Sequence, residues 1–187
     1  MVQKRDLSAE KIIRTTMTLI SEQGPDAATF SNIATALSCK TQALYFYFKN
    51  RNDLLTAVSH EFFREINNTV QESCVGLHGR EAVIALATAM RDFGLASVPL
   101  AVTVMRVSGI SNDQLAASET KHLSQMLQTF IADFIDDDDP VKRLSLSRGV
   151  RALVVGEIVS ESVGWFRNPV IHHDDSFLDN LNRLLAD

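Results

Sequence analysis

Five side chains between positions 40 and 46 combine hydrogen-bonding groups with aromatic rings. They are Lys40, Thr41, Gln42, Tyr45 and Phe46, and their spacing predicts that they stay exposed on one short helix. Glutamine can form two hydrogen bonds to adenine, whereas lysine and tyrosine can reach guanine or a phosphate group. This combination of side chains favours contact with the major groove of DNA.

The surrounding residues predict the scaffold that such contacts need. Capping residues and apolar periodicity predict three helices, over residues 8–23, 29–37 and 41–47. A tight turn at Ser38-Cys39-Lys40 joins the second helix to the third. Ala34 and Ala43 are small enough to let these two helices cross closely. A supporting helix followed by two short helices around a three-residue turn is the helix-turn-helix layout.

Charge is distributed unevenly along the chain, whose formal net charge is −5. Residues 1–55 carry seven Lys and Arg against five Asp and Glu, whereas residues 56–187 carry eleven bases and eighteen acids. No carboxylate lies between Asp26 and Asp53. A segment without carboxylates can approach phosphate groups without like-charge repulsion, so this distribution supports nucleic-acid binding by the amino-terminal part.

The rest of the chain is also predicted to be helical. A long helix is expected to begin after its capping residue Asn50, and further helices are expected over about 81–96, 99–108, 112–135, 141–166 and 174–185. Only eight glycines and four prolines occur in 187 residues, which argues against a turn-rich β design. We therefore expect an all-α protein.

Several classes of protein are disfavoured by what the sequence lacks. It contains no stretch of eighteen apolar residues, so no membrane span is predicted. Its two cysteines, Cys39 and Cys74, are not spaced as a metal or redox motif. We find no nucleophile with a partner base and no glycine-rich phosphate loop. We expect a cytoplasmic protein with no catalytic site, no cofactor and no bound metal.

The segment from Phe30 to Leu55, FSNIATALSCKTQALYFYFKNRNDLL, resembles the amino-terminal domain of the TetR family of repressors. The shared pattern is an Ile-Ala pair, then Leu-Tyr-x-(His/Tyr)-Phe, then a basic residue followed by Leu-Leu. The resemblance covers about residues 8–60. It implies a DNA-binding domain over residues 1–55, with the helix-turn-helix at about 29–48. A helical ligand-binding and dimerisation domain would follow over residues 56–187.

The resemblance also implies which side chains contact DNA. The start of the second helix would contact phosphate or base edges, the exposed face of the third would contact bases, and the residues after it would hold the DNA backbone. In that order the residues are Thr29, Ser31 and Asn32; Lys40, Thr41, Gln42 and Tyr45; and Tyr47, Lys49 and Arg51. Tyr45 and Tyr47 could instead belong only to the hydrophobic core, as Phe48 does, but the basic residues around them favour DNA contact.

The turn departs from the family's usual Gly-Val-Ser. Ser38 must adopt a turn conformation without the freedom of glycine. Lys40 replaces the usual cap of the third helix, so Thr41 is expected to cap it instead. Cys39 stands where the family has valine, and a small buried residue is favoured over a redox sensor there. These departures leave the operator sequence undetermined.

The larger domain is expected to hold both an effector pocket and a dimer interface. Met and Phe side chains can repack around varied apolar ligands, and the expected pocket residues are Met90, Phe93, Met105, Met126, Phe130 and Phe134. The resemblance implies that the last two helices pack against a second copy as a four-helix interface. Its expected members are Arg148, Leu153, Ile158, Trp165, Phe166, Phe177, Leu181 and Leu184. Plain core packing is the alternative for each of these residues.

Two further groups of side chains have types that suit chemistry. The run His172-His173-Asp174-Asp175 could bind a metal, but solvated histidines and an aspartate that caps the next helix are favoured. Glu157 and Glu161 lie one helical turn apart and, with Arg151, could form an acid–base site. Structural or ligand-orienting charges are favoured there.

These observations predict a homodimeric transcriptional regulator that binds a palindromic double-stranded DNA operator. Repression that is relieved by a small-molecule ligand is the expected mode of control. Control by a partner protein is the first alternative. An all-helical enzyme and a sequence-independent DNA binder are the others.

Overall fold

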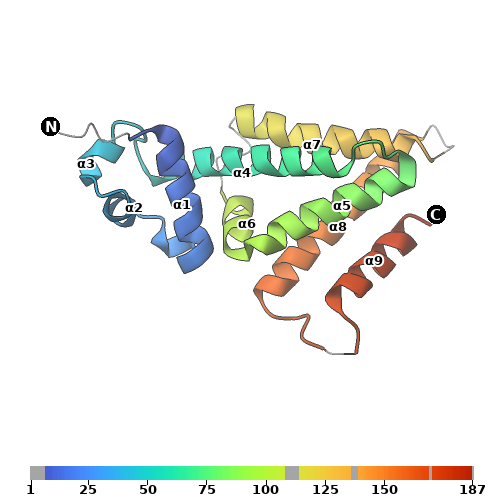
Figure 1. Cartoon of the computed structure of the whole chain (residues 1–187). Helices are drawn as coiled ribbons and strands as arrows, with labels where there is room; N and C mark the ends of the chain where they lie inside the picture. Colours follow the sequence, from blue (N-terminus) through green and yellow to red (C-terminus); the bar gives the residue numbers. More distant parts are fainter. Residues whose placement is uncertain (1–6, 108–113, 136–138, 169, 187) are drawn as a thin grey trace. The chain divides into compact units, whose positions relative to one another are not determined.

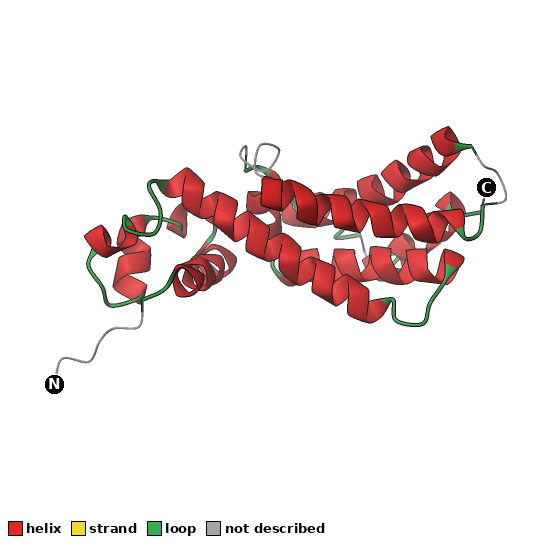
Figure 2. Ribbon diagram, turned by 90° about the horizontal axis from the view of Figure 1, so that it is seen from above, coloured by secondary structure: helices red, strands yellow, loops and turns green. Residues whose placement is uncertain are grey.

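The computed structural model describes residues 7–107, 114–135, 139–168 and 170–186. These residues form helices and connecting loops without any strand (Figures 1 and 2), which confirms the predicted all-α class. The helices are α1 (Ala9–Gln23), the short 3-10 helix η1 (Pro25–Ala27), α2 (Phe30–Ala36), α3 (Thr41–Leu44), α4 (Arg51–Ser73), α5 (Gly79–Ala96), α6 (Val98–Met105), α7 (Gln114–Ala132), α8 (Pro140–Ser162) and α9 (His173–Leu184).

The chain divides into two compact units. The first unit comprises Met1–Phe62 and Pro99–Ala117, and the second comprises Phe63–Val98 and Ser118–Asp187. The sequence predicts a boundary at residues 55 and 56, whereas this division falls further along, inside the unbroken helix α4. Most of α6 also groups with the first unit, which the expected two-domain order did not include.

Helices α1, α2 and α3 form the scaffold of the first unit (Figure 1). Ile12 and Ile20 of α1, Ile33 of α2 and Leu44 of α3 are fully buried. Burying side chains of this size contributes about 1.5–3 kcal/mol each to folding. This small core fixes where α3 lies on α1 and α2.

The predicted starts of the first helices are confirmed by their caps. The hydroxyl of Ser8 accepts a hydrogen bond from the backbone N–H of Lys11, and that of Thr29 accepts one from Asn32. The side-chain oxygen of Asn50 accepts a bond from the backbone N–H of Asp53 at 2.9 Å. Short polar side chains at these positions satisfy backbone donors that have no partner inside the helix.

Two predicted helix ends are wrong. Thr41 is the first residue of α3 and not its cap; Lys40 occupies the cap position, and its side chain makes no capping hydrogen bond. The sequence also predicts that the long eighth helix reaches Phe166, but α8 ends at Ser162. Gly164 follows with a φ of 71°, a left-handed conformation that ends helices at low cost because glycine has no Cβ.

In the second unit, α8 packs along α5 and also against α9. Its core includes Val154 and Ile158 of α8 and Phe177 and Leu181 of α9, all fully buried. Gly94 of α5 allows close contact with Ile158, because a Cβ at this glycine would collide with the Ile158 side chain. The helices of this unit are therefore held by tight apolar packing.

Among the described residues, no single helix is long and apolar enough to cross a membrane. The consecutive helices α5 and α6 reach the required length and hydropathy only when taken together.

The expected strain at Ser38 can be tested. Its φ is 50°, a conformation that costs a residue with a Cβ about 1–2 kcal/mol relative to glycine. Ser38→Gly removes this cost but gives the unfolded chain more freedom, so we expect the free energy of unfolding to rise by about 0.5–1 kcal/mol. Urea denaturation followed by circular dichroism measures the change.

The matched control is Ala36→Gly, which places glycine at an exposed helical residue of the same segment. It should lower the free energy of unfolding by about 0.5–1 kcal/mol. Equal losses from both variants would show that Ser38 is not strained.

Candidate nucleic-acid interface

The segment that joins α2 to α3 is fixed by its backbone and by buried side chains. The N–H of Cys39 donates to the carbonyl of Ala34 at 2.9 Å, which closes the turn after α2. Leu44 and Phe48 are buried on the inner side of α3 and of the turn that follows it. The outer side of the same segment is therefore held in a defined orientation.

The helical path continues for about one turn beyond α3. The backbone N–H groups of Tyr47 and Phe48 both donate to the carbonyl of Leu44, at 2.9 and 3.0 Å. Residues three and four apart consequently share one face, which places Tyr45 and Phe46 on the side of Gln42. Tyr45 is 57% exposed and Phe46 is 87% exposed. We name Gln42, Tyr45 and Phe46 the recognition face.

Basic side chains lie on both sides of the recognition face. Lys40 precedes it and Lys49 follows it, and both are exposed. The side chains of Lys40, Gln42 and Lys49 make no hydrogen bond or ion pair with any part of the chain that the structure describes. The exposed hydroxyl of Ser31 on α2 is also unbonded within the described ranges. These groups are available to an external partner.

Tyr45 is held by a ring contact, whereas Thr41 is half-buried. The ring of Tyr45 packs against the buried Phe30, with centroids 4.8 Å apart and planes tilted by 59°. This contact orients the phenol while leaving more than half of the side chain exposed. Of the expected base-contact residues, Lys40, Gln42 and Tyr45 thus lie exposed, and Thr41 is partly covered.

At the start of α2, two expected DNA contacts have structural roles in this chain. The Thr29 hydroxyl caps α2 through the backbone N–H of Asn32 at 3.1 Å. The Asn32 side-chain amide donates to the carbonyl of Ala27, also at 3.1 Å. Phosphate or base contact by Thr29 and Asn32 remains a prediction.

Tyr47 and Arg51 are likewise bonded within the protein. The Tyr47 hydroxyl donates to the carbonyl of Leu7 at 2.6 Å, which ties the turn after α3 to the segment before α1. The Arg51 guanidinium donates to the carbonyls of Ala28 and Pro25, both at 2.9 Å. No sequence signal marks these roles, because any residue can supply the backbone carbonyl that accepts the bond, and the acceptors lie 23 to 40 residues away. Arg51 retains further N–H donors for phosphate.

These features define a DNA-binding transcriptional regulator of the helix-turn-helix class. The recognition face is exposed, fixed on a three-helix scaffold and part of a segment that lacks carboxylates between Asp26 and Asp53. Residues 12–58 match the model of a family described as bacterial regulatory proteins, tetR family. This match confirms the resemblance to that family that the sequence predicts for the amino-terminal part.

Solved structures of low identity share the fold. FadR from Bacillus subtilis, in complex with stearoyl-CoA, has a TM-score of 0.72 at 15% identity, covering 96% of each chain. A TetR variant from Acinetobacter baumannii, in complex with minocycline, has a TM-score of 0.71 at 20% identity, covering 97% of this chain and 96% of that one. BioQ with its double-stranded DNA operator has a TM-score of 0.65 at 18% identity, covering 97% of each chain. A search of curated proteins found no match.

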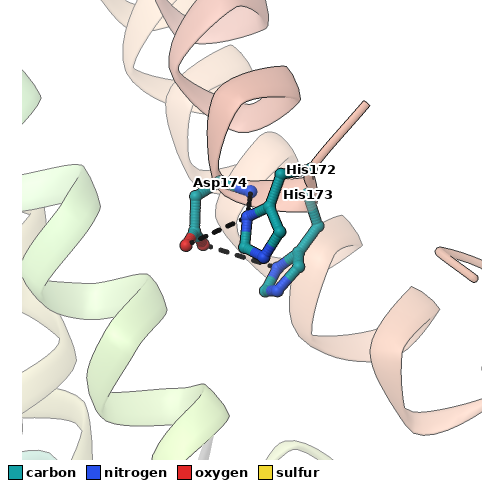
Figure 3. A group of neighbouring side chains, drawn as sticks. All are labelled: His172, His173 and Asp174. Atoms are coloured by element: carbon teal, nitrogen blue, oxygen red, sulfur yellow. Dashed lines mark hydrogen bonds and ion pairs between the residues drawn. The ribbon is translucent and has the colours of Figure 1, made fainter. Parts of the chain in front are cut away.

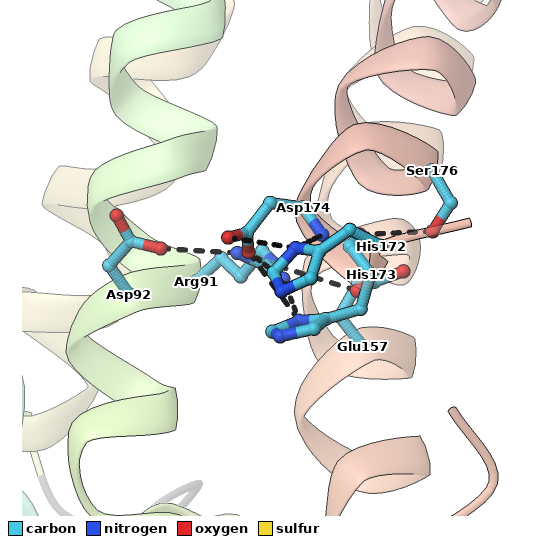
Figure 4. A network of polar contacts seen from close by, with 7 residues as sticks. All are labelled: Arg91, Asp92, Glu157, His172, His173, Asp174 and Ser176. Carbon is cyan, nitrogen blue, oxygen red and sulfur yellow. Dashed lines mark hydrogen bonds and ion pairs between the residues drawn. The ribbon is translucent and has the colours of Figure 1, made fainter. Parts of the chain in front are cut away.

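The second unit contains a cluster of polar side chains centred on the buried Arg91 of α5 (Figure 4). Nε of Arg91 lies 3.3 Å from Oε2 of Glu157 on α8, and Nη2 lies 2.7 Å from Oδ1 of Asp174 on α9. Nη1 lies 3.2 Å from Oδ1 of Asp92, and the guanidinium carbon lies 4.8 Å from the ring centroid of Phe177. One arginine therefore joins three helices. We name this cluster the Arg91 network.

The pKa values of the two carboxyl groups that Arg91 joins across helices are shifted in opposite directions. Burial raises the pKa of Glu157 above its ordinary value, and the hydrogen bond and charge of Arg91 offset only part of this rise. The hydrogen bond from Arg91 lowers the pKa of the half-exposed Asp174. Asp174 therefore stabilises the fold above the ordinary aspartate pKa, and this contribution is lost as pH falls through the lowered value.

His172, His173 and Asp174 bring three potential metal-ligand atoms within 4.8 Å of one another (Figure 3). However, Arg91 Nη2 lies 2.7 Å from Nδ1 of His173, and since arginine is only a donor, this nitrogen accepts. The same guanidinium pairs with Asp174. A cation in contact with two of the three residues opposes a metal ion there. His172, and not Asp174, occupies the cap position of α9.

The suspected acid–base group does not come together. Glu157 is buried and pairs with Arg91, whereas Glu161 is exposed. Arg151 donates to the hydroxyl of Ser124 at 2.8 Å and to the carbonyl of Ser147 at 3.3 Å. Arg151 and Glu157 thus have structural partners, in agreement with the structural alternative.

The expected pocket residues are distributed over several elements. Met90 and Phe93 lie on α5, Met105 on α6, Met126 and Phe130 on α7, and Phe134 after α7. A groove of about 570 Å³ lies between α7 and α8, and it includes none of them. Its lining residues are Gln125, Gln128, Thr129, Ala132, Pro140, Arg143 and Leu144. The predicted pocket thus remains a prediction.

Three members of the expected dimer interface take the alternative role of core residues. Ile158, Phe177 and Leu181 are fully buried inside the second unit, so they cannot supply a surface to another copy. Trp165 is 76% exposed and Phe166 is also exposed. Arg148 is exposed, and Leu153 and Leu184 are half-buried, with Leu184 against Gly149. The sequence does not give the rotation of α8, because apolar residues occur all around this helix.

Lys49 and Arg51 are expected to respond differently to substitution. Lys49→Ala should leave the free energy of unfolding unchanged and reduce the slope of log affinity against log salt by about one per protomer, since one phosphate contact is lost. Arg51→Met removes donors to two loop carbonyls and should cost about 1–3 kcal/mol of stability. DNA-binding titrations at several salt concentrations and urea denaturation measure the two effects. Reversed behaviour of the two variants would refute these assignments.

The Arg91 network should show strong coupling in a double-mutant cycle. Arg91→Met leaves the buried Glu157 carboxylate unpaired and should cost about 3–5 kcal/mol. Adding Glu157→Leu should recover most of this loss, because both charges are then replaced by apolar groups. Urea denaturation at fixed protein concentration measures each corner of the cycle.

The control for this cycle is Arg183→Met, which breaks the exposed pair with Asp179 at 2.7 Å on α9. That change should cost less than about 0.5 kcal/mol. Additive effects of the Arg91 and Glu157 substitutions would show that the two side chains are not coupled.

Proposed function

We propose that this protein is a homodimeric repressor that binds a palindromic operator in the cytoplasm and is released by a small molecule. The observation that carries the DNA-binding part is the recognition face, exposed to 57% at Tyr45 and 87% at Phe46. It is flanked by Lys40 and Lys49, whose side chains have no partner among the residues that the structure describes. Gln42 supplies adenine specificity, Lys40 contacts guanine or phosphate, and Lys49 supplies affinity through a phosphate contact.

An exposed apolar stripe on α8 supports the homodimer. Val155 and Val159 of this helix and Val163 directly after it recur every four residues and are 41%, 41% and 56% exposed. Trp165 and Phe166 continue the apolar surface beyond α8. Side chains four apart form a ridge that packs into the groove of another helix, and a twofold axis can pair the same ridge with itself. The stripe replaces the buried members of the sequence-based interface.

A small-molecule effector is supported by the solved structures of the same fold. FadR was crystallised with stearoyl-CoA and the TetR variant with minocycline. In our proposal a ligand in the region of residues 56–187 shifts α4 and changes the separation of the two recognition faces in the dimer. The ligand must bind the released state more tightly than the DNA-bound state.

Selection of bound sequences from a random DNA pool tests this function. At physiological salt we expect one enriched palindrome whose half-site centres lie about 34–36 Å apart, one turn of DNA or a multiple of it. Failure of the purified, ligand-free dimer to enrich any motif would contradict the proposal.

Gln42→Ala should lose discrimination at one base pair of each half-site by a factor of about 5–100. Specificity profiles of the wild type and the variant on single-base operator substitutions measure this loss. Lys49→Ala is the matched control, because it should weaken all sequences equally. An unchanged profile for Gln42→Ala would exclude this residue from base recognition.

A further inference from the structure

Phe46 is the most exposed aromatic side chain in the described part of the chain, at 87%. It lies four residues after Gln42 and therefore on the same face of the helical segment. Exposure of a phenyl ring to water is unfavourable, because nearly all of its surface is apolar. The ring nevertheless lies on the surface that carries the base-contacting residues.

The ring of Phe46 has a defined support. It packs edge-on against Tyr47, with centroids 5.4 Å apart and planes at 79°. Tyr47 is itself anchored through its hydroxyl to the carbonyl of Leu7 at 2.6 Å. The flanking residues Leu44 and Phe48 are buried and fix the backbone on both sides. The ring is therefore oriented before any partner binds.

A phenyl ring can contribute only apolar contact to the recognition of DNA. In the major groove, the 5-methyl group of thymine is the apolar feature on the edge of the base pairs. Gln42, one turn earlier on the same face, suits adenine. A face that carries glutamine and phenylalanine side by side thus matches two neighbouring bases in the major groove. One is an adenine that Gln42 contacts, and the other is a thymine whose methyl group Phe46 contacts.

We propose that Phe46 is a specificity-determining residue that contacts the 5-methyl group of a thymine in each operator half-site. This inference rests on the proposed function, because it assumes that the recognition face enters the major groove. Phe46 belongs to the exposed set that the sequence places at the major groove but not to the ten contacts that the resemblance implies, and the inference assigns methyl recognition to it.

Replacement of thymine by deoxyuridine tests the inference, since it removes the methyl group and keeps base pairing. Each thymine of the selected operator is replaced in turn, and affinity is measured for the wild-type protein. We expect one position per half-site at which the affinity falls about threefold to tenfold, as burial of one methyl group implies. With Phe46→Ala, thymine and deoxyuridine at that position should bind equally.

Two further variants keep the result interpretable. Phe46→Leu retains an apolar side chain and should keep part of the thymine preference. This variant also allows the test where Phe46→Ala does not fold. Val75→Ala truncates a similarly exposed apolar residue, 80% exposed, outside the first unit, and should change neither operator affinity nor the thymine preference.

The outcomes separate this inference from the proposed function. A wild-type protein that selects a palindrome but binds thymine and deoxyuridine equally at every position overturns the role of Phe46 and leaves the repressor function intact. A preference for thymine that persists unchanged in Phe46→Ala and Phe46→Leu also overturns it. A loss of affinity in Phe46→Ala without any methyl dependence would indicate a wedge between base steps instead. Absence of any selected motif would contradict the function itself.

Discussion

A recognition helix of one turn has almost no stability of its own, so its shape depends on what is buried behind it. Helix formation needs several turns to offset the cost of nucleation, and α3 spans only Thr41–Leu44. The burial of Leu44 and Phe48 supplies the stability that the hydrogen bonds of so short a helix cannot supply. Tyr47 and Arg51 add bonds to loop carbonyls on either side. DNA recognition in this chain is therefore a property of the small core of the first unit.

The second unit relies on a different kind of constraint. Its apolar packing is supplemented by Arg91, a buried cation with acceptors on α8 and α9. Apolar contacts tolerate small shifts of one helix along another, whereas a guanidinium with directed donors does not. The network thereby fixes where α9 begins relative to α5 and α8. That position matters because α8 and the segment that follows it carry the exposed apolar surface.

Local signals in the sequence predict much of this fold. Ser8, Thr29 and Asn50 cap helices as predicted, because a cap depends only on residues three positions away. The pairing of Arg91 with Glu157 spans 66 residues and could not be predicted from spacing. It was equally impossible to predict which face of α8 is buried, since its apolar residues do not mark a single face. The recognition face was predictable because the alternation of buried and exposed residues around Leu44 is local.

The position of Trp165 has a spectroscopic consequence. It is the only tryptophan of the chain, and it is 76% exposed just after α8, on the apolar surface that follows the valine stripe. Intrinsic fluorescence excited at the indole band therefore reports on this one surface. Covering the indole by another protein surface would move its emission to shorter wavelengths, because the excited-state dipole is then no longer relaxed by water. The protein thus carries a built-in probe of whether this surface is open or covered.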